Sequence, residues 1–134
     1  MLFEHIDFLD EQFTCQKDKF IGIRDGKIAY IGSSRPEGDW GERYDGRHGL
    51  LMSGFVNAHS HAPMVLLRGY AENLPLDRWL NDRVFPFEDK LTDDAVYAST
   101  TLACAEMLRF GTVSFTDMYF FCQGMARAIV SSGI

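Results

Sequence analysis

The segment of the chain that decides its fold reads LMSGFVNAHSH and covers residues 51–61. Residues 51–58 are apolar enough for a strand that is buried on both faces, as the strands of parallel sheets are. This strand runs directly into His59 and His61, whose side chains point to the same face because they are two residues apart on a strand. The pattern therefore predicts two neighbouring imidazoles at the carboxyl end of a buried strand, where the active sites of parallel barrels and sheets gather.

Two imidazoles at this position can bind one metal ion, with Zn–N distances of about 2.0–2.1 Å. A catalytic zinc site takes about three protein ligands and keeps one position open for a water molecule, whose pKa the metal lowers to about 7. An H-x-H pair also occurs by chance, so the spacing alone leaves a metal role and a purely structural role open. Cupin-type and metallo-β-lactamase-type sites are excluded, because Pro63, Met64 and Val65 stand where those motifs need acidic residues and a histidine.

Downstream of the histidines, the sequence predicts a long loop and a helix. Residues 62–91 form a connection with three prolines and short helical stretches such as 76–84, which is typical of a lid or binding loop. Residues 93–110 are the clearest helix, with Thr92 as N-cap and Gly111 to end it. Its buried stripe is expected to consist of Val96, Thr100, Ala103, Met107 and Phe110.

A strand over 112–118 and a second helix over about 123–132 complete the order strand, loop, helix, strand, helix. That order is the start of a βαβα series and predicts a parallel sheet. Asp117, near the end of the second strand, is expected to cap the following turn rather than to support a ligand histidine. The first fifty residues differ, because two β-rich runs, 20–24 and 27–31, flank the dipeptide DG, the strongest short-range signal for a hairpin.

The composition is that of a folded protein without affinity for polyanions. The 134 residues include 46% hydrophobic and 24% charged side chains, and 13 basic against 19 acidic residues give a net charge of −6. Clustered Lys and Arg are absent, which argues against nucleic acid or an anionic membrane as a partner. Without an apolar run of about 18 residues or a signal peptide, the chain is expected to be cytoplasmic. Cys15, Cys104 and Cys122 form no C-x-x-C pair and are expected to be free, mostly buried thiols.

The segment SGFVNAHSHAPM, residues 53–64, resembles the signature of the amidohydrolase superfamily that is usually written PGFVNAHTH. The stretches LLRG (66–69), FPFEDKLT (85–92) and DMY (117–119) are similar to one branch of it. That branch is the chlorohydrolase/deaminase group, which contains 5-methylthioadenosine/S-adenosylhomocysteine deaminase. The hairpin DGKI (25–28) is similar to the β-sandwich that precedes the family's barrel. The resemblance therefore covers nearly the whole chain.

The resemblance implies a fold in two parts. Residues 1–50 would be the N-terminal part of a small β-sandwich domain, and residues 51–134 the start of a (β/α)8 barrel of the TIM type, with its first two βα units. A complete barrel takes about 250 residues, so the barrel is expected to be incomplete and the chain to be the N-terminal fragment of a longer enzyme. Ser53 and Ser60 replace the Pro and Thr of the signature, and neither is a ligand.

The resemblance also implies the chemistry, which is hydrolytic deamination of an adenine nucleoside. Hydroxide on a zinc or iron ion would attack the ring carbon that carries the amino group. His59 and His61 would bind the metal, Glu88 would bind the ribose hydroxyls, and Trp79 would line the substrate site. The remaining ligands, two histidines and an aspartate, and the proton-shuttling glutamate would lie beyond Ile134.

Alternatives stay open at this stage. Within the same class a guanine deaminase, a cytosine deaminase or a triazine hydrolase would fit, although Glu88 favours a nucleoside. Met64, Leu66 and Phe85 could line the substrate site or belong to the core. A chain with half a metal site is expected to bind zinc weakly and to be inactive alone. It could instead be a truncated, non-catalytic product that only self-associates through the open edge of strand 112–118.

Overall fold

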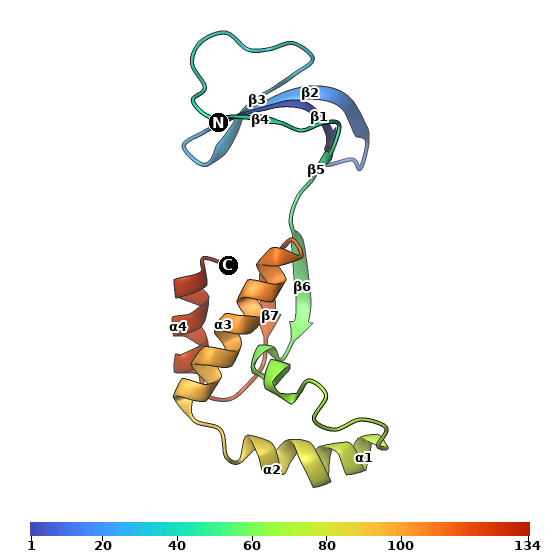
Figure 1. Cartoon of the computed structure of the whole chain (residues 1–134), viewed down its shortest axis with the longest axis vertical. Coiled ribbons are helices and arrows are strands. Elements are labelled where there is room, and N and C mark those ends of the chain that lie inside the picture. Colours follow the sequence, from blue (N-terminus) through green and yellow to red (C-terminus); the bar gives the residue numbers. More distant parts are fainter. The chain divides into compact units, whose positions relative to one another are not determined.

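The computed structural model describes residues 1 to 134, and the chain divides into two compact units (Figure 1). The first unit comprises Met1–Ser53 and the second Gly54–Ile134. Each unit has a sheet of its own. The helices are all too short or too polar to cross a membrane.

The first unit is a five-stranded sheet with a small apolar core. Strand β1 pairs antiparallel with β2, which pairs antiparallel with β3, whereas β4 and β5 run parallel to β1. Leu2, Ile6 and Ile21 are buried and form the core of this unit. The strands are β1 (Leu2–Leu9), β2 (Cys15–Arg24), β3 (Lys27–Gly32), β4 (Arg43–Asp45) and β5 (Leu50–Leu51).

The hairpin that the sequence predicts between β2 and β3 is confirmed. The strands pair as far as Arg24 and Lys27, and the two residues between them, Asp25 and Gly26, have φ values of 51° and 70°. A two-residue turn with positive φ at both positions is of type I′, whose twist matches that of the flanking strands. Glycine adopts such a φ without strain, and aspartate tolerates it better than most residues do.

The second unit has the mixed α/β order that the sequence predicts. Strands β6 and β7 run parallel, the helical segments up to α3 connect them, and α4 follows β7 (Figure 1). The predicted long connection contains one continuous helical run over residues 76–88. The elements are β6 (Phe55–Ser60), the 3₁₀ helix η1 (Ala62–Leu67), α1 (Leu76–Trp79), the π-helical turn η2 (Leu80–Val84), α2 (Phe85–Glu88), α3 (Asp93–Arg109), β7 (Thr112–Asp117) and α4 (Cys122–Ser132).

Strand β6 differs from its predicted bounds and burial. The prediction was a strand over 51–58 that is buried on both faces, whereas β6 begins at Phe55 and continues through His59. Leu51 belongs instead to β5, where it pairs with β1 of the first unit. Phe55 and Val56 remain 56% and 69% exposed. The reason is that β6 pairs with β7 alone, and a sheet of two strands covers few side chains.

Helix α3 is confirmed, with two corrections to its buried stripe: Met107, expected to be buried, is only half-buried, and Phe110 is exposed. The side chain of Thr92 accepts a hydrogen bond from the backbone N–H of Ala95 at 3.2 Å, and Gly111 follows the helix with a φ of 85°. Phe110, expected to be buried, is 75% exposed. Its backbone has left the helical conformation, which turns its side chain away from the stripe. The buried residues of α3 are Val96, Ser99, Thr100, Ala103 and Cys104.

The three cysteines are free thiols, as predicted, but only one of them is buried. Cys104 lies within the buried stripe of α3, whereas Cys15 and Cys122 are exposed. The expectation of mostly buried thiols is therefore wrong. Both exposed cysteines are the first residues of their elements, β2 and α4, where neighbouring side chains cover less of the surface.

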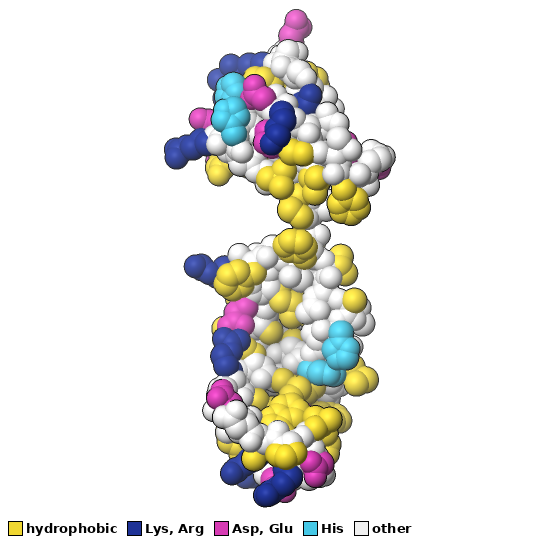
Figure 2. All heavy atoms as spheres, turned by 90° about the vertical axis from the view of Figure 1, so that its right-hand side faces the viewer, with side chains coloured by type: hydrophobic (Ala, Val, Ile, Leu, Met, Phe, Trp, Pro, Cys, Tyr) yellow, Lys and Arg dark blue, Asp and Glu magenta, His cyan; other side chains and the backbone are white.

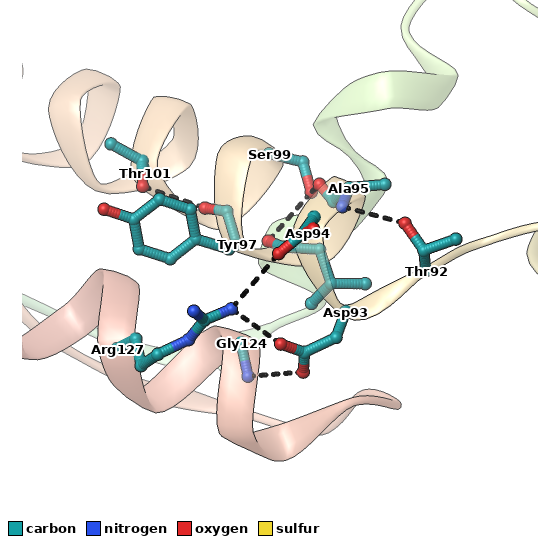
Figure 3. A network of polar contacts seen from close by, with 10 residues as sticks. Thr92, Asp93, Asp94, Ala95, Tyr97, Ser99, Thr101, Gly124 and Arg127 are labelled. Carbon is teal, nitrogen blue, oxygen red and sulfur yellow. Dashed lines mark hydrogen bonds and ion pairs between the residues drawn. The ribbon is translucent and has the colours of Figure 1, made fainter.

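A polar network joins the first turns of α3 and α4 (Figure 3). One oxygen of the Asp93 carboxylate accepts a hydrogen bond from the backbone N–H of Gly124 at 2.8 Å, and the other accepts from Arg127 at 2.6 Å. The guanidinium of Arg127 also lies 5.0 Å from the centroid of the Tyr97 ring. A single carboxylate therefore ties the start of α3 to the backbone and to a side chain of α4.

Replacing Gly124 with alanine is expected to destabilise the packing of α3 against α4. A Cβ atom at this position would lie 2.5 Å from the backbone oxygen of Asp93, so the helices would have to move apart. We expect a net loss of about 1–2 kcal/mol, because overpacking outweighs the higher helix propensity of alanine. Hydrogen exchange of the α3 amides measures this loss. Gln123→Ala at the exposed neighbouring residue is the control, and an unchanged opening free energy in Gly124→Ala would contradict the expectation.

Candidate metal centre and adjoining pocket

The two predicted histidines converge at the carboxyl end of β6. His59 is close to the end of the strand and His61 directly follows it, so both side chains project from the same edge of the parallel sheet. Their Nε2 atoms are 3.3 Å apart, and the ring planes are inclined at 85°. The alternation of side chains along a strand thus places both imidazole rings on the same face.

The orientation of the His61 ring depends on β7. Nδ1 of His61 lies 2.8 Å from the backbone oxygen of Met118, the first residue after β7. A carbonyl oxygen only accepts, so the proton of the neutral imidazole lies on Nδ1 and the lone pair lies on Nε2. Metal-binding histidines commonly donate their second N–H in this way, which fixes the ring and leaves Nε2 free for the ion.

The pair fits a tetrahedral zinc ion as two of its ligands. Two nitrogens that are each about 2.0–2.1 Å from a tetrahedral ion are about 3.3–3.4 Å apart. The separation of the two Nε2 atoms, 3.3 Å, agrees with this value. No group of three or more His, Cys, Asp or Glu side chains in the chain could hold a metal ion. The two histidines by themselves are thus fewer than the three or four protein ligands that zinc sites usually have.

Asp117 caps backbone N–H groups, but not those of a following turn as the sequence predicts. One carboxylate oxygen accepts a hydrogen bond from the backbone N–H of Ala62 at 3.0 Å, and the other accepts from the backbone N–H of Met118 at 2.7 Å. Ala62 directly follows His61, and Met118 provides the backbone oxygen that lies near Nδ1 of His61. Asp117 thus holds the backbone on both sides of the His61 ring without contacting the ring itself.

A cavity of about 450 Å³ adjoins His61. Its walls come from the helical run 76–88, from η1 and from the residues that follow β7. The only polar side chains that line it are His61, Glu88 and Tyr119, and the rest of the lining is aliphatic, aromatic or thioether. In Figure 2 the histidines of the second unit border a group of hydrophobic side chains. A cavity of this kind suits a small, largely apolar ligand with a few polar groups.

The candidate residues divide into those that meet at this cavity and those that do not. The cavity brings together His61 with four others that the sequence analysis named: Met64, Trp79, Phe85 and Glu88. His59 lies at a smaller neighbouring hollow that also reaches His61. Leu66 is 42% exposed and lines neither of the two.

Tyr119 also belongs to the site, although the sequence alone indicates no role for it. Its hydroxyl donates a hydrogen bond to the Glu88 carboxylate at 2.7 Å. Burial raises the pKa of Tyr119 well above its usual value, and the hydrogen bond and the negative charges of Glu88 and Asp117 raise it further. The phenol is therefore neutral and able to donate at physiological pH. The signal in the sequence was the DMY stretch at 117–119, which indicated a resemblance but no contact.

The fold and the site define an α/β chain whose candidate site lies at the carboxyl end of parallel strands, as in many enzymes. Residues 50–133 match the Amidohydrolase family, and the chain belongs to that family. It is 46% identical over 112 residues to the 5'-deoxyadenosine deaminase of Methanothermobacter thermautotrophicus, a match that covers 84% of this chain and 26% of the relative. It is 45% identical over 116 residues to the 5-methylthioadenosine/S-adenosylhomocysteine deaminase of Syntrophomonas wolfei, covering 86% of this chain and 27% of the relative. The chain thus spans about a quarter of the length of these relatives.

Solved structures show the same architecture. An adenosine deaminase from Xanthomonas campestris with bound zinc superposes with a TM-score of 0.78 at 29% identity, covering 97% of this chain and 31% of that one. Atrazine chlorohydrolase from Arthrobacter aurescens TC1 complexed with zinc superposes with a TM-score of 0.85 at 20% identity, covering 99% of this chain and 34% of that one. The second similarity concerns the fold alone.

Proposed function

We propose that the chain supplies part of the active site of a metal-dependent deaminase that acts on adenine nucleosides of the 5-methylthioadenosine/S-adenosylhomocysteine type. The observation that carries the proposal is the convergence of the His59 and His61 Nε2 atoms, 3.3 Å apart, beside a cavity that contains a carboxylate. Relatives at 45–46% identity are named deaminases of such nucleosides, which supports the same substrate class.

Each of the candidate site residues has a defined role in this proposal. His59 and His61 would hold zinc or iron, whose chemistry when bound would be to activate a water molecule near neutral pH. Glu88 accepts hydrogen bonds from the ribose hydroxyls, because an ionised carboxylate can accept two charge-assisted bonds from a vicinal diol. Trp79 packs against the substrate in the apolar part of the cavity. The further metal ligands and the group that transfers protons come from residues outside these 134.

The proposal extends to the fold. Strands β6 and β7, with the helices that follow them, are the first two βα units of a (β/α)8 barrel. The boundary expected at residue 51 moves to residue 54, because Leu51 pairs with β1 of the first unit. The second unit, Gly54–Ile134, then belongs to the barrel, and the first unit, Met1–Ser53, is part of a β-sandwich domain. The parallel pairing of β6 and β7 and the similarity to amidohydrolase structures support this assignment.

The test begins with the intact mass of the protein in its source cells, detected with an antibody against this segment. Every polypeptide found is then assayed for ammonia release from 5'-methylthioadenosine, S-adenosylhomocysteine and adenosine. Guanine, cytosine and atrazine serve as the rival substrates. We expect activity on the adenine nucleosides in a species larger than 15.2 kDa and none in a 15.2-kDa species. Activity on a rival substrate alone would contradict the proposal.

The isolated 134-residue chain is expected to self-associate. Apolar side chains of the small sheet, among them Val56 and Val113, are 69% and 51% exposed, and β7 has a free edge next to them. Exposed strand edges and apolar patches favour pairing with other chains. Light scattering over a range of concentrations should therefore report a dimer or larger species. A compact monomer at high concentration would contradict this expectation.

A further inference from the structure

Tyr119 and Glu88 form a hydrogen bond between two segments that are distant in the sequence. The two residues are 31 positions apart, and the hydroxyl of Tyr119 donates to Oε1 of Glu88 at 2.7 Å. Glu88 is the last residue of α2, and Tyr119 lies just beyond the end of β7. The hydrogen bond therefore links the two segments that form this part of the cavity wall, α2 and the residues after β7.

The carboxylate of Glu88 has no other partner in the chain. It forms no ion pair, whereas several other acidic residues of the chain do, for example Glu106 with Arg68. A carboxylate has about four acceptor sites, and a single phenol uses one of them. The remaining acceptor capacity lies at a cavity whose other lining is almost entirely apolar. Such a group is poised to accept hydrogen bonds from a ligand.

We infer that Tyr119 is a positioning residue that orients the Glu88 carboxylate toward the two hydroxyls of a bound ribonucleoside. This inference rests on the proposed function, because it assumes that Glu88 meets a ribose. A long, flexible glutamate loses rotamer freedom when it binds a ligand, and a hydrogen bond already made in the free protein reduces that loss. Tyr119 then contributes to selectivity for ribose over 2'-deoxyribose without touching the sugar.

The test is isothermal titration calorimetry of the 134-residue chain with adenosine and with 2'-deoxyadenosine, in the presence of zinc. Tyr119→Phe removes the hydroxyl and keeps the ring. We expect the affinity for adenosine to fall about five- to tenfold, as for a lost hydrogen bond to a charged group. The affinity for 2'-deoxyadenosine should change less than about twofold, because that ligand lacks one of the two hydroxyls that the carboxylate binds.

Tyr70→Phe is the matched control. The Tyr70 ring lies 5.5 Å from the ring of Phe87, the residue before Glu88, and its hydroxyl makes no hydrogen bond within the chain. This variant should bind both nucleosides like the unmodified chain. In a Glu88→Gln background, Tyr119→Phe should have a smaller effect on the ratio of the two affinities, because the uncharged amide forms weaker hydrogen bonds with the ribose hydroxyls.

The outcomes separate the inference from the proposed function. Equal weakening of both nucleosides in Tyr119→Phe would indicate a packing role and would overturn the inference, as would unchanged binding of both. In either case nucleoside binding by the unmodified chain would leave the proposed function standing. If the unmodified chain bound neither nucleoside, the inference would be overturned, whereas the proposed function would still be decided by ammonia release from the larger species.

Discussion

Replacement of His61 with alanine is expected to lower the affinity of the chain for zinc by about 100-fold or more. Changes to groups that merely support a ligand cost about 10–100-fold in metal affinity, and this change removes a ligand itself. The Met118 carbonyl holds the His61 ring so that Nε2 faces the Nε2 of His59 at 3.3 Å. His59→Ala should have the same effect, because one imidazole alone cannot chelate.

The other two histidines of the chain provide the matched controls for this experiment. His5 and His48 belong to the first unit, and their rings are 6.3 Å apart between centroids. Neither His5→Ala nor His48→Ala should change the zinc affinity, which is measured from zinc-dependent shifts of the histidine ring signals in NMR spectra. An equal loss of affinity in these variants would show that zinc binds elsewhere.

The zinc affinity of the unmodified chain is itself expected to be weak. With His59 and His61 as the proposed ligands, the chain would supply two of the three or four protein ligands that zinc sites usually have. Zinc should therefore be lost during dialysis against a chelator. If stoichiometric zinc remained after that treatment, two chains would have to share ligands, and the ligands would need to be sought across a dimer.

Replacement of Glu88 with glutamine is expected to lower the affinity for adenine ribonucleosides about 10–100-fold. The amide keeps the size of the side chain but loses the charge, and hydrogen bonds to charged groups are worth about 1.5–3 kcal/mol. The tyrosine contact survives this change, because the amide oxygen still accepts from Tyr119. The loss therefore reports on the ligand and not on the packing of α2.

Calorimetric titration with 5'-methylthioadenosine measures this effect. Asp89→Asn removes the neighbouring exposed carboxylate and leaves Glu88 in place, so it should bind the nucleoside like the unmodified chain. Free adenine, which has no ribose, should bind the Glu88→Gln variant and the unmodified chain alike. A similar loss with adenine would mean that Glu88 supports the cavity and does not contact the sugar.

Features that depend on neighbouring residues could be predicted from the sequence. The turn at Asp25-Gly26, the N-cap at Thr92 and the end of α3 at Gly111 each follow from a few adjacent residues, and each is present. The convergence of His59 and His61 also belongs to this group, because two residues on one strand share a face whatever lies around them. Local geometry therefore accounts for the turns, the caps and the pair of imidazoles.

Burial could not be predicted in the same way. The apolar stretch 51–58 has the composition of a buried strand, yet Leu51 pairs in the first unit and Val56 remains exposed. Phe110 matches the period of the α3 stripe but lies beyond the last helical residue. Whether an apolar side chain is covered depends on the elements that pack against it, and the period of a sequence does not identify those elements.

The α/β order, the hairpin and the position of two imidazoles at the end of a strand follow from the sequence alone. How these groups are held depends on contacts between distant segments. The Met118 carbonyl on His61, the Asp117 cap on Ala62 and the Tyr119 hydroxyl on Glu88 join residues that are 31 to 57 positions apart. The contacts at His61 and Ala62 form because the parallel pairing of β6 with β7 brings the ends of both strands to one edge of the sheet, and the contact at Glu88 adds α2 to that edge.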